Sequence, residues 1–139
     1  MSRKPHFEKV AVGDLAPVRR HLLTRTDLVR YAGASGDFNP MHHDELLATA
    51  AGQPSVFGHG MFSMGFLGSA LTGWVGPGRV VRYAVRFSRQ TWPGETLVTE
   101  VVVTAKREEG TRQLIEVDCS LANELGEQKV IGTAALDFN

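Results

Sequence analysis

The chain has 139 residues, 42% of them hydrophobic, which is enough for one core, so we expect residues 1–139 to form a single domain. Fifteen Lys and Arg residues balance fifteen Asp and Glu residues, and this balance leaves no strong field for holding nucleic acid. The single cysteine, Cys119, cannot form an internal disulfide, and the N-terminus lacks the apolar run of a signal peptide. We therefore expect a cytoplasmic protein, with Cys119 as a small core residue of a strand.

A short strand and a helix are predicted first along the chain. Residues 18–23 have a strand-like pattern, and Thr24 or Thr26 after them can cap a helix by accepting a hydrogen bond from its first turn. Ser35 and Gly36 are predicted to close this helix, because glycine readily adopts the backbone conformation found at helix ends.

A second helix is predicted to follow closely. Asn39 suits the capping position and Pro40 the first helical position. Asp44 and Glu45 carry negative charge that suits the positive end of a helix. Gly52, with a proline two residues later, is predicted to end it.

The third predicted helix, roughly residues 59–74, is apolar on every side, which is typical of a core helix. Gly65, Gly68 and Gly73 weaken it by about 1 kcal/mol each relative to alanine. We expect another backbone to pack close to these glycines, because close packing would offset that cost.

A membrane-spanning helix is the alternative interpretation of this region. Residues 56–75 carry no Lys, Arg, Asp or Glu and are long enough to cross a bilayer. However, they include His59 and five glycines and have no basic flank close by. The pattern therefore favours a buried helix and no membrane association.

From Arg79 onward the apolar pattern has a period of two, which indicates strands. Four apolar residues of the first strand are predicted to face the same way: Val81, Tyr83, Val85 and Phe87. Three further strands are predicted over residues 97–106, 112–122 and 128–138, with hairpin turns at residues 108–110 and 123–127. A long apolar helix followed by an antiparallel sheet that wraps it predicts an α+β architecture.

The most informative stretch is the run Gly36-Asp37-x-Asn39-Pro40-x-His42. It resembles the hydratase 2 motif of the MaoC-like family, which comprises (R)-specific enoyl-CoA hydratases and 3-hydroxyacyl thioester dehydratases. The resemblance covers nearly the whole chain, because His59-Gly60-Met61 and the Pro93-Gly94-Glu95 turn are also similar to that family. Within it, the length and residues 60–76 look most like catalytic subunits of actinobacterial (3R)-hydroxyacyl carrier-protein dehydratases.

The spacing of these residues also makes chemical sense without the family. If Asn39 and Pro40 start a helix, Asp37 lies just outside it and His42 lies in its first turn, so both can approach one water molecule. Hydration of an enoyl thioester needs a base, an acid, and donors for the enolate-like oxygen. Asp37 and His42 can supply the first two functions. The Gly60 amide at the start of the long helix is a candidate for the third.

The resemblance implies a hot-dog fold in which Asp37 and His42 are the catalytic pair, Asn39 orients them and the Gly60 amide polarises the thioester carbonyl. Family members place a serine of the long helix near the pair, whereas this chain has Gly68 at the corresponding position. The sequence does not indicate which of Asp37 and His42 takes the proton from water.

The resemblance also implies partners. The substrate would be a thioester of coenzyme A or of acyl carrier protein, and the assembly would be a homodimer or a heterodimer with a second hot-dog subunit, joined edge to edge. Neither a phosphate-binding glycine loop nor a nucleotide fingerprint is present, so we expect no cofactor. A metal site formed by His42, His43 and Asp44 is not expected, because adjacent helical residues diverge by about 100°.

Other residues leave alternatives open. His59 could contact the substrate, or it could bond a loop carbonyl as helix-terminal histidines do. Arg82 and Arg86, in a basic series that extends from Arg79 to Arg89, could line a solvated sheet face or hold the phosphates of coenzyme A or the acidic surface of a carrier protein.

Two rival functions also remain at this point. A hot-dog thioesterase would use a carboxylate near the same helix to hydrolyse the thioester. A non-catalytic acyl-binding subunit of a larger dehydratase would have no need of Asp37 and His42.

Overall fold

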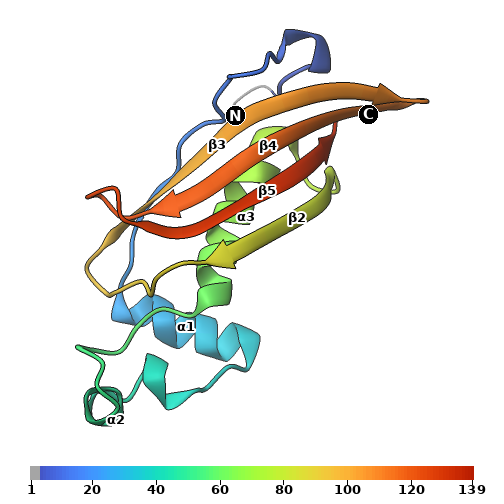
Figure 1. Cartoon of the computed structure of the whole chain (residues 1–139). Helices are drawn as coiled ribbons and strands as arrows, with labels where there is room; N and C mark the ends of the chain where they lie inside the picture. Colours follow the sequence, from blue (N-terminus) through green and yellow to red (C-terminus); the bar gives the residue numbers. More distant parts are fainter. Residues whose placement is uncertain (1–3) are drawn as a thin grey trace.

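A curved five-stranded antiparallel sheet wraps one long helix in the computed structural model, which describes residues 4–139 (Figure 1). Residues 1–3, part of the N-terminus that was assessed for a signal peptide, lie outside the described residues. The elements in chain order are η1 (Phe7–Lys9), β1 (Arg20–Leu22), α1 (Arg25–Ser35), η2 (Pro40–His42), α2 (Glu45–Ala50), α3 (Gly60–Val75), β2 (Val80–Phe87), β3 (Thr96–Glu109), β4 (Arg112–Ala122) and β5 (Gln128–Asp137). The strand order is β1-β3-β4-β5-β2. This arrangement is the expected hot-dog fold.

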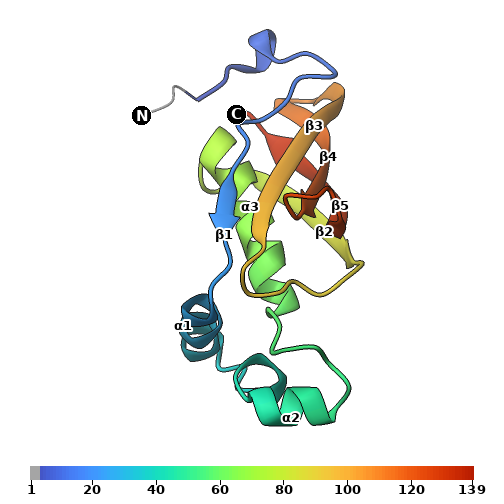
Figure 2. The same ribbon diagram turned by 90° about the vertical axis from the view of Figure 1, so that its left-hand side faces the viewer.

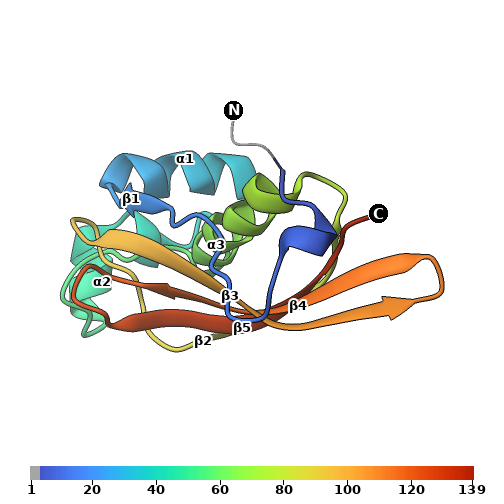
Figure 3. The same ribbon diagram turned by 90° about the horizontal axis from the view of Figure 1, so that it is seen from above.

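The core lies between α3 and the concave face of the sheet. Leu67 and Leu71 of α3 are fully buried, and Cys119 of β4 belongs to the same cluster, as predicted. Seen from above, the β3–β4 hairpin projects beyond the helix (Figure 3). The smaller helices α1 and α2 gather beyond the N-terminal end of α3 (Figure 2). That end of α3 therefore lies next to the segments that carry the family-like motif.

The start of α1 confirms one of the two predicted caps. The Thr24 side chain accepts a hydrogen bond from the Asp27 amide, and the Asp27 carboxylate accepts one from the Thr24 amide. This reciprocal pair is a capping box, which fixes the first turn. Gly36 ends the helix with a φ of 75°, a left-handed conformation that glycine adopts without strain.

The prediction of one continuous helix after Asn39 was wrong. The chain instead forms the 3₁₀ turn η2 and then α2. Asn39 caps η2, as expected, by accepting a hydrogen bond from the Met41 amide. Asp44, expected inside the helix, caps α2 by accepting one from the Leu47 amide. A second cap within five residues interrupts the helix, because a capping side chain competes for the amides of the next turn.

The first long strand departs from strict alternation. The pairing of β2 with β5 is irregular between Val80 and Arg82. Val80 packs against the core, whereas Val81, predicted to face inward, is 43% exposed. A bulge of this kind adds one residue to the strand, so the side chains on one side of it point to the opposite face of the sheet from the one that strict alternation predicts. Tyr83 and Val85 pack against the core as predicted, whereas Phe87 at the end of the strand is 49% exposed.

The glycines of α3 do not meet a neighbouring backbone, contrary to expectation. A side chain at Gly65 would meet nothing within 4 Å, and one at Gly73 would lie 3.7 Å from the Arg19 guanidinium. At Gly68 a Cβ would lie 3.2 Å from the ring of Tyr83, whose hydroxyl donates to the Met64 carbonyl at 2.8 Å. Gly68 thus makes room for an aromatic ring of β2. Within residues 4–139, no helix is both long and apolar enough to cross a membrane.

A close backbone approach does occur at Gly132 of β5. A Cβ there would collide with the Ala84 carbonyl and the Val85 side chain of the neighbouring strand β2. We expect Gly132→Ala to lower the free energy of unfolding by about 2 kcal/mol, because well-packed interiors do not accommodate an added methyl group without strain. Urea denaturation measures the effect.

Gly33→Ala is the matched control for this substitution. Gly33 lies inside α1, and a methyl group there would meet nothing within 4 Å. This variant is expected to be slightly more stable than the wild type, by up to about 1 kcal/mol. Equal urea midpoints for Gly132→Ala and the wild type would contradict the close approach of β2 and β5.

Candidate active site

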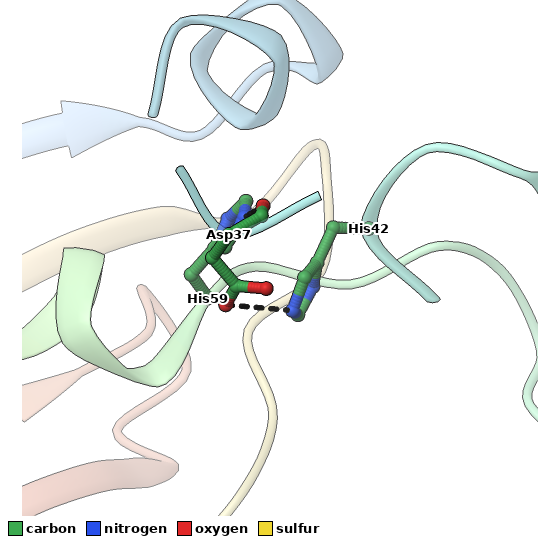
Figure 4. A group of neighbouring side chains, drawn as sticks. All are labelled: Asp37, His42 and His59. Atoms are coloured by element: carbon green, nitrogen blue, oxygen red, sulfur yellow. Dashed lines mark hydrogen bonds and ion pairs between the residues drawn. The ribbon is translucent and has the colours of Figure 1, made fainter. Parts of the chain in front are cut away.

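Three side chains from separate segments meet at the N-terminal end of α3 (Figure 4). Asp37 lies in the loop after α1, His42 ends the 3₁₀ turn η2, and His59 immediately precedes α3. Each offers a nitrogen or oxygen within 4.8 Å of the other two. The structure therefore brings together the two residues predicted to be catalytic and the histidine whose role was open.

Backbone hydrogen bonds hold the loop that carries Asp37. The Ser35 hydroxyl accepts from the Asp37 amide at 3.1 Å, and Asp37 Oδ1 accepts from the Asn39 amide at 3.2 Å. The Asn39 carbonyl in turn accepts from the His42 amide at 3.0 Å. Asn39 is thus bonded to both members of the pair, although its side chain only caps η2. This geometry is compatible with the predicted orienting role of Asn39, which stays a prediction.

His42 is buried and has one nitrogen committed to the backbone. Its Nδ1 lies 2.7 Å from the Phe57 carbonyl, and because a carbonyl only accepts, Nδ1 must carry the hydrogen. The other nitrogen, Nε2, faces Asp37 Oδ2 at 3.8 Å. That distance is too long for a direct hydrogen bond. Since the Asp37 side chain is 51% exposed, the pair presents a carboxylate and an imidazole nitrogen to a ligand or water at the surface.

His59 bonds a loop carbonyl, which is one of the two roles that the sequence left open. Its ring is almost completely buried, and Nε2 lies 3.1 Å from the Asp37 carbonyl. The ring also stacks on that of His42, with centroids 3.8 Å apart and an interplanar angle of 27°. Burial lowers the pKa of His59 below its ordinary value near 6.5, outweighing the hydrogen bond to Asp37, which raises it. The ring is therefore neutral at physiological pH.

The lowered pKa of His59 predicts how stability depends on pH. Below pH 6.5 the unfolded chain binds a proton at this position more readily than the folded chain, so the free energy of unfolding decreases as pH falls. For one proton the slope cannot exceed about 1.4 kcal/mol per pH unit. Urea denaturation between pH 7.5 and roughly pH 5.5 measures it.

His59→Gln removes this titration and serves as the control. Carboxylates also make the free energy of unfolding depend on pH, but at lower pH than histidine does. Asp137 is an example, because the Asn139 amide and Arg112 lower its pKa. A steeper pH dependence in the wild type than in the variant is the expected result. Parallel curves would show that His59 has an ordinary pKa.

A metal does not fit the three side chains well, although they are the one group of His, Cys, Asp and Glu within residues 4–139 close enough to share an ion. Stacked imidazoles direct their in-plane lone pairs side by side and not toward one point. The residues considered earlier for a metal are also engaged elsewhere. His43 bonds the Phe38 carbonyl, and Asp44 caps α2.

Gly60 is the first residue of α3 and borders a pocket. His59, at the capping position, makes no side-chain cap, so the first amides of α3 remain available to a ligand. The adjoining pocket has a volume of about 310 Å³ and is lined in part by Gly60, Ser63, Phe87, Arg89 and Val130. The positive end of the α3 dipole faces the same place, which favours developing negative charge there.

The structure does not bring Arg82 or Arg86 to this pocket. Arg82 pairs with Glu116 at 2.8 Å, and Arg86 borders a separate groove on the outer face of the sheet with Glu100 and Asp118. Arg89 does line the pocket and pairs with Glu127 at 3.3 Å. The carrier-binding role of Arg82 and Arg86 stays a prediction.

Two elements of the site were missed by sequence reasoning. The Phe57 carbonyl fixes the His42 tautomer, but a backbone group leaves no signature in residue type. The Thr91 carbonyl accepts from the Gly58 amide at 2.8 Å, and a Cβ at Gly58 would collide with the Thr91 hydroxyl. Gly58 was the signal in the sequence that could have indicated this contact, because a glycine beside a motif indicates close packing.

Comparison with known proteins identifies the family of the chain. Residues 8–124 match the family described as MaoC like domain. The chain is 39% identical over 82 residues to 3-hydroxyacyl-thioester dehydratase Y of Mycobacterium tuberculosis, covering 56% of this chain but only 28% of that protein. It is 29% identical over 122 residues to the (R)-specific enoyl-CoA hydratase of Rhodospirillum rubrum, covering 86% of this chain and 84% of that protein.

A solved structure is also similar. The crystal structure of the ChsH1-ChsH2 complex from Mycobacterium tuberculosis contains a chain that superposes with a TM-score of 0.81 at 28% identity, covering 93% of this chain and 98% of that one. The likeness thus extends over almost the whole of both chains.

Proposed function

The chain belongs to the MaoC-like domain family, and from this membership we propose that it is a hydro-lyase. The proposed reaction is the reversible addition of water to a trans-2-enoyl thioester, giving the (R)-3-hydroxyacyl thioester. The observation that carries the proposal is the pairing of Asp37 with His42 beside the uncapped start of α3. We expect the protein to act in the cytoplasm and without a cofactor.

The dyad would move two protons in each turnover. In hydration, one member accepts a proton from water as its oxygen attacks C3, and the other gives a proton to C2. Because the Phe57 carbonyl holds the hydrogen on His42 Nδ1, the nitrogen that exchanges protons is Nε2. The dyad therefore starts each turnover with one exchangeable proton, on Asp37 or on His42 Nε2. It ends with one as well, because the proton taken from water replaces the proton given to C2.

Charge on the thioester oxygen would be stabilised at Gly60. As C3 is attacked, electrons move toward the carbonyl and give an enolate-like oxygen. The uncapped start of α3 supports a role for the Gly60 amide and the helix dipole in stabilising that charge. A side chain at Gly60 would contact the Phe87 ring at 3.3 Å, so glycine also keeps this approach open.

The carrier of the acyl group is proposed to be coenzyme A or acyl carrier protein. Both attach the acyl chain through phosphopantetheine, so both offer a phosphate. Because Arg89 lines the pocket beside Gly60 and Arg82 and Arg86 do not, we propose Arg89 as the residue that contacts this phosphate.

A dimer of hot-dog subunits is the proposed assembly. Within residues 4–139, no strand pairs with the outer edge of β2. Phe38 next to Asp37 and Phe87 at the end of β2 are exposed apolar side chains. The similar mycobacterial structure is itself a complex of two proteins. A homodimer and a heterodimer with a second subunit are both compatible, and light scattering of the purified chain would distinguish them.

The test of the function follows the loss of conjugated enoyl absorbance when purified protein meets a short and a long trans-2-enoyl-CoA. An (R)-3-hydroxyacyl product is expected. Release of free thiol would instead favour a thioesterase. If coenzyme A substrates fail, the same assay with acyl carrier protein and a second hot-dog subunit decides between a hydro-lyase and a non-catalytic acyl-binding subunit.

A further inference from the structure

His59 contacts both members of the dyad without lying between them. It is hydrogen-bonded to the backbone of Asp37 and stacked on the ring of His42. We propose that His59 is a positioning residue, which must remain uncharged to hold Asp37 and His42 in their working arrangement. This inference rests on the proposed hydro-lyase activity of the same site.

The hydrogen bond determines the tautomer of His59. Because the Asp37 carbonyl can only accept, the hydrogen must be on Nε2, and Nδ1 is then unprotonated in the neutral ring. Nδ1 is buried and finds no hydrogen-bond partner among residues 4–139. Adding a proton there would create a buried donor without an acceptor, which is costly. The surroundings of His59 thus oppose its protonation.

The groups that face the ring act on its charge in opposite directions. Tyr31 of α1 lies against one side with ring centroids 4.8 Å apart, and His42 of η2 stacks against the ring at 3.8 Å. Asp37 contributes its carbonyl to the hydrogen bond, and both this bond and its negative carboxylate favour a proton on His59, but the burial of the ring outweighs them. Charge on His59 would repel a protonated His42 across the stack. Because burial lowers the pKa of His59, its ring stays neutral and this repulsion does not arise.

The stack gives His59 an influence on proton transfer. When His42 carries its second proton, its cationic ring lies over the face of a neutral aromatic ring, which is a favourable arrangement. At the same time, the hydrogen bond fixes the backbone from which the Asp37 carboxylate projects. His59 therefore touches no reacting atom but sets the position of one partner and the electrostatic surroundings of the other.

Two substitutions separate these contributions. His59→Gln keeps an N–H donor for the Asp37 carbonyl but removes the ring. His59→Phe keeps a ring to stack on His42 but removes the donor. In the His59→Gln variant, a cationic His42 loses the aromatic face over which it lies. We therefore expect the limb nearest neutral pH in the plot of kcat/KM against pH to move by at least about 0.5 pH unit toward lower pH. We expect His59→Phe to keep both limbs in place and lower kcat about 10-fold, because Asp37 is less well fixed.

The matched control is His43→Gln, which changes an exposed histidine of the same segment that bonds the Phe38 carbonyl. It is expected to change neither kcat nor the pH profile. Equal losses of activity in both His59 variants with an unchanged profile would mean that His59 acts only in packing, and the proposal would be overturned. Unchanged kinetics in both variants would overturn it as well.

Nuclear magnetic resonance of the wild-type imidazole nitrogens tests the proposal even if the variants do not fold. His59 is expected to show a hydrogen on Nε2 and to remain neutral while other histidines titrate. A hydrogen on Nδ1, or titration at an ordinary histidine pH, would overturn the proposal. If the wild type folds but is inactive with every thioester offered, the proposed function fails, and the nitrogen spectra still report on His59 independently.

Discussion

Replacing Asp37 with Asn, or His42 with Gln, is expected to lower kcat for enoyl-CoA hydration by about 10³-fold. Asn cannot exchange a proton as the carboxylate does, and Gln offers no nitrogen with the basicity of imidazole Nε2. Both substitutions preserve size, and the Asp37 side chain is half exposed, so the fold should be retained. Absorbance assays of each purified variant measure the loss, with circular dichroism to verify folding.

The controls for these variants lie a few residues away. Asp44→Asn retains a side chain that can cap α2, and His43→Gln alters an exposed ring, so both are expected to keep wild-type activity. The double variant of Asp37 and His42 is expected to be about as inactive as either single variant, because the two act as one unit. Activity within tenfold of the wild type in either single variant would exclude a dyad mechanism.

Lys129→Met is expected to destabilise the protein by about 3 kcal/mol, which corresponds to a fall in Tm of roughly 10 °C. The Lys129 side chain is 0% exposed, and its ammonium group donates to Glu95 at 2.8 Å, to Glu127 and to the Gln90 carbonyl. Methionine fills the space but leaves the Glu95 carboxylate, only 17% exposed, without its cation. Thermal and urea unfolding measure the cost.

Partner substitutions show whether the buried charge is the cause. Adding Glu95→Gln to Lys129→Met should recover part of the lost stability, since an uncharged amide tolerates the site better than an unpaired carboxylate. Glu127→Gln alone should have a small effect, because that side chain is far more exposed. If the Lys129→Met, Glu95→Gln double variant is no more stable than Lys129→Met alone, the loss comes from packing and not from charge.

The same lysine illustrates what sequence patterns can and cannot predict. Period-two alternation in β5 places Val130 and Leu136 in the core, as observed, and assigns Lys129 to the opposite, solvated face. The loop between β2 and β3 folds over Lys129 and supplies the Gln90 carbonyl. A contact of this kind depends on the path of a loop, and the alternation of residues along one strand does not predict that path.

The candidate site was predicted in part for a similar reason. The short spacing from Asp37 to His42 places them together through local hydrogen bonds, which sequence can indicate. The Phe57 carbonyl and the His59 ring come from a segment 15 to 22 residues farther along the chain. Backbone hydrogen bonds to the Met41 and Thr91 carbonyls hold that segment in place. Local caps likewise explain the split of the expected second helix at Asp44.

The uncapped start of α3 implies a conflict between robustness and activity. Serine or aspartate at position 59 could cap the central helix of the core, and such substitutions are a common route to thermostability. Here the cap would occupy the amides that the proposed mechanism assigns to a developing oxyanion, and the substitution would remove the ring stacked on His42. Selection for heat resistance alone would therefore favour variants that have lost the proposed activity. Engineering of this protein should leave the first turn of α3 unchanged.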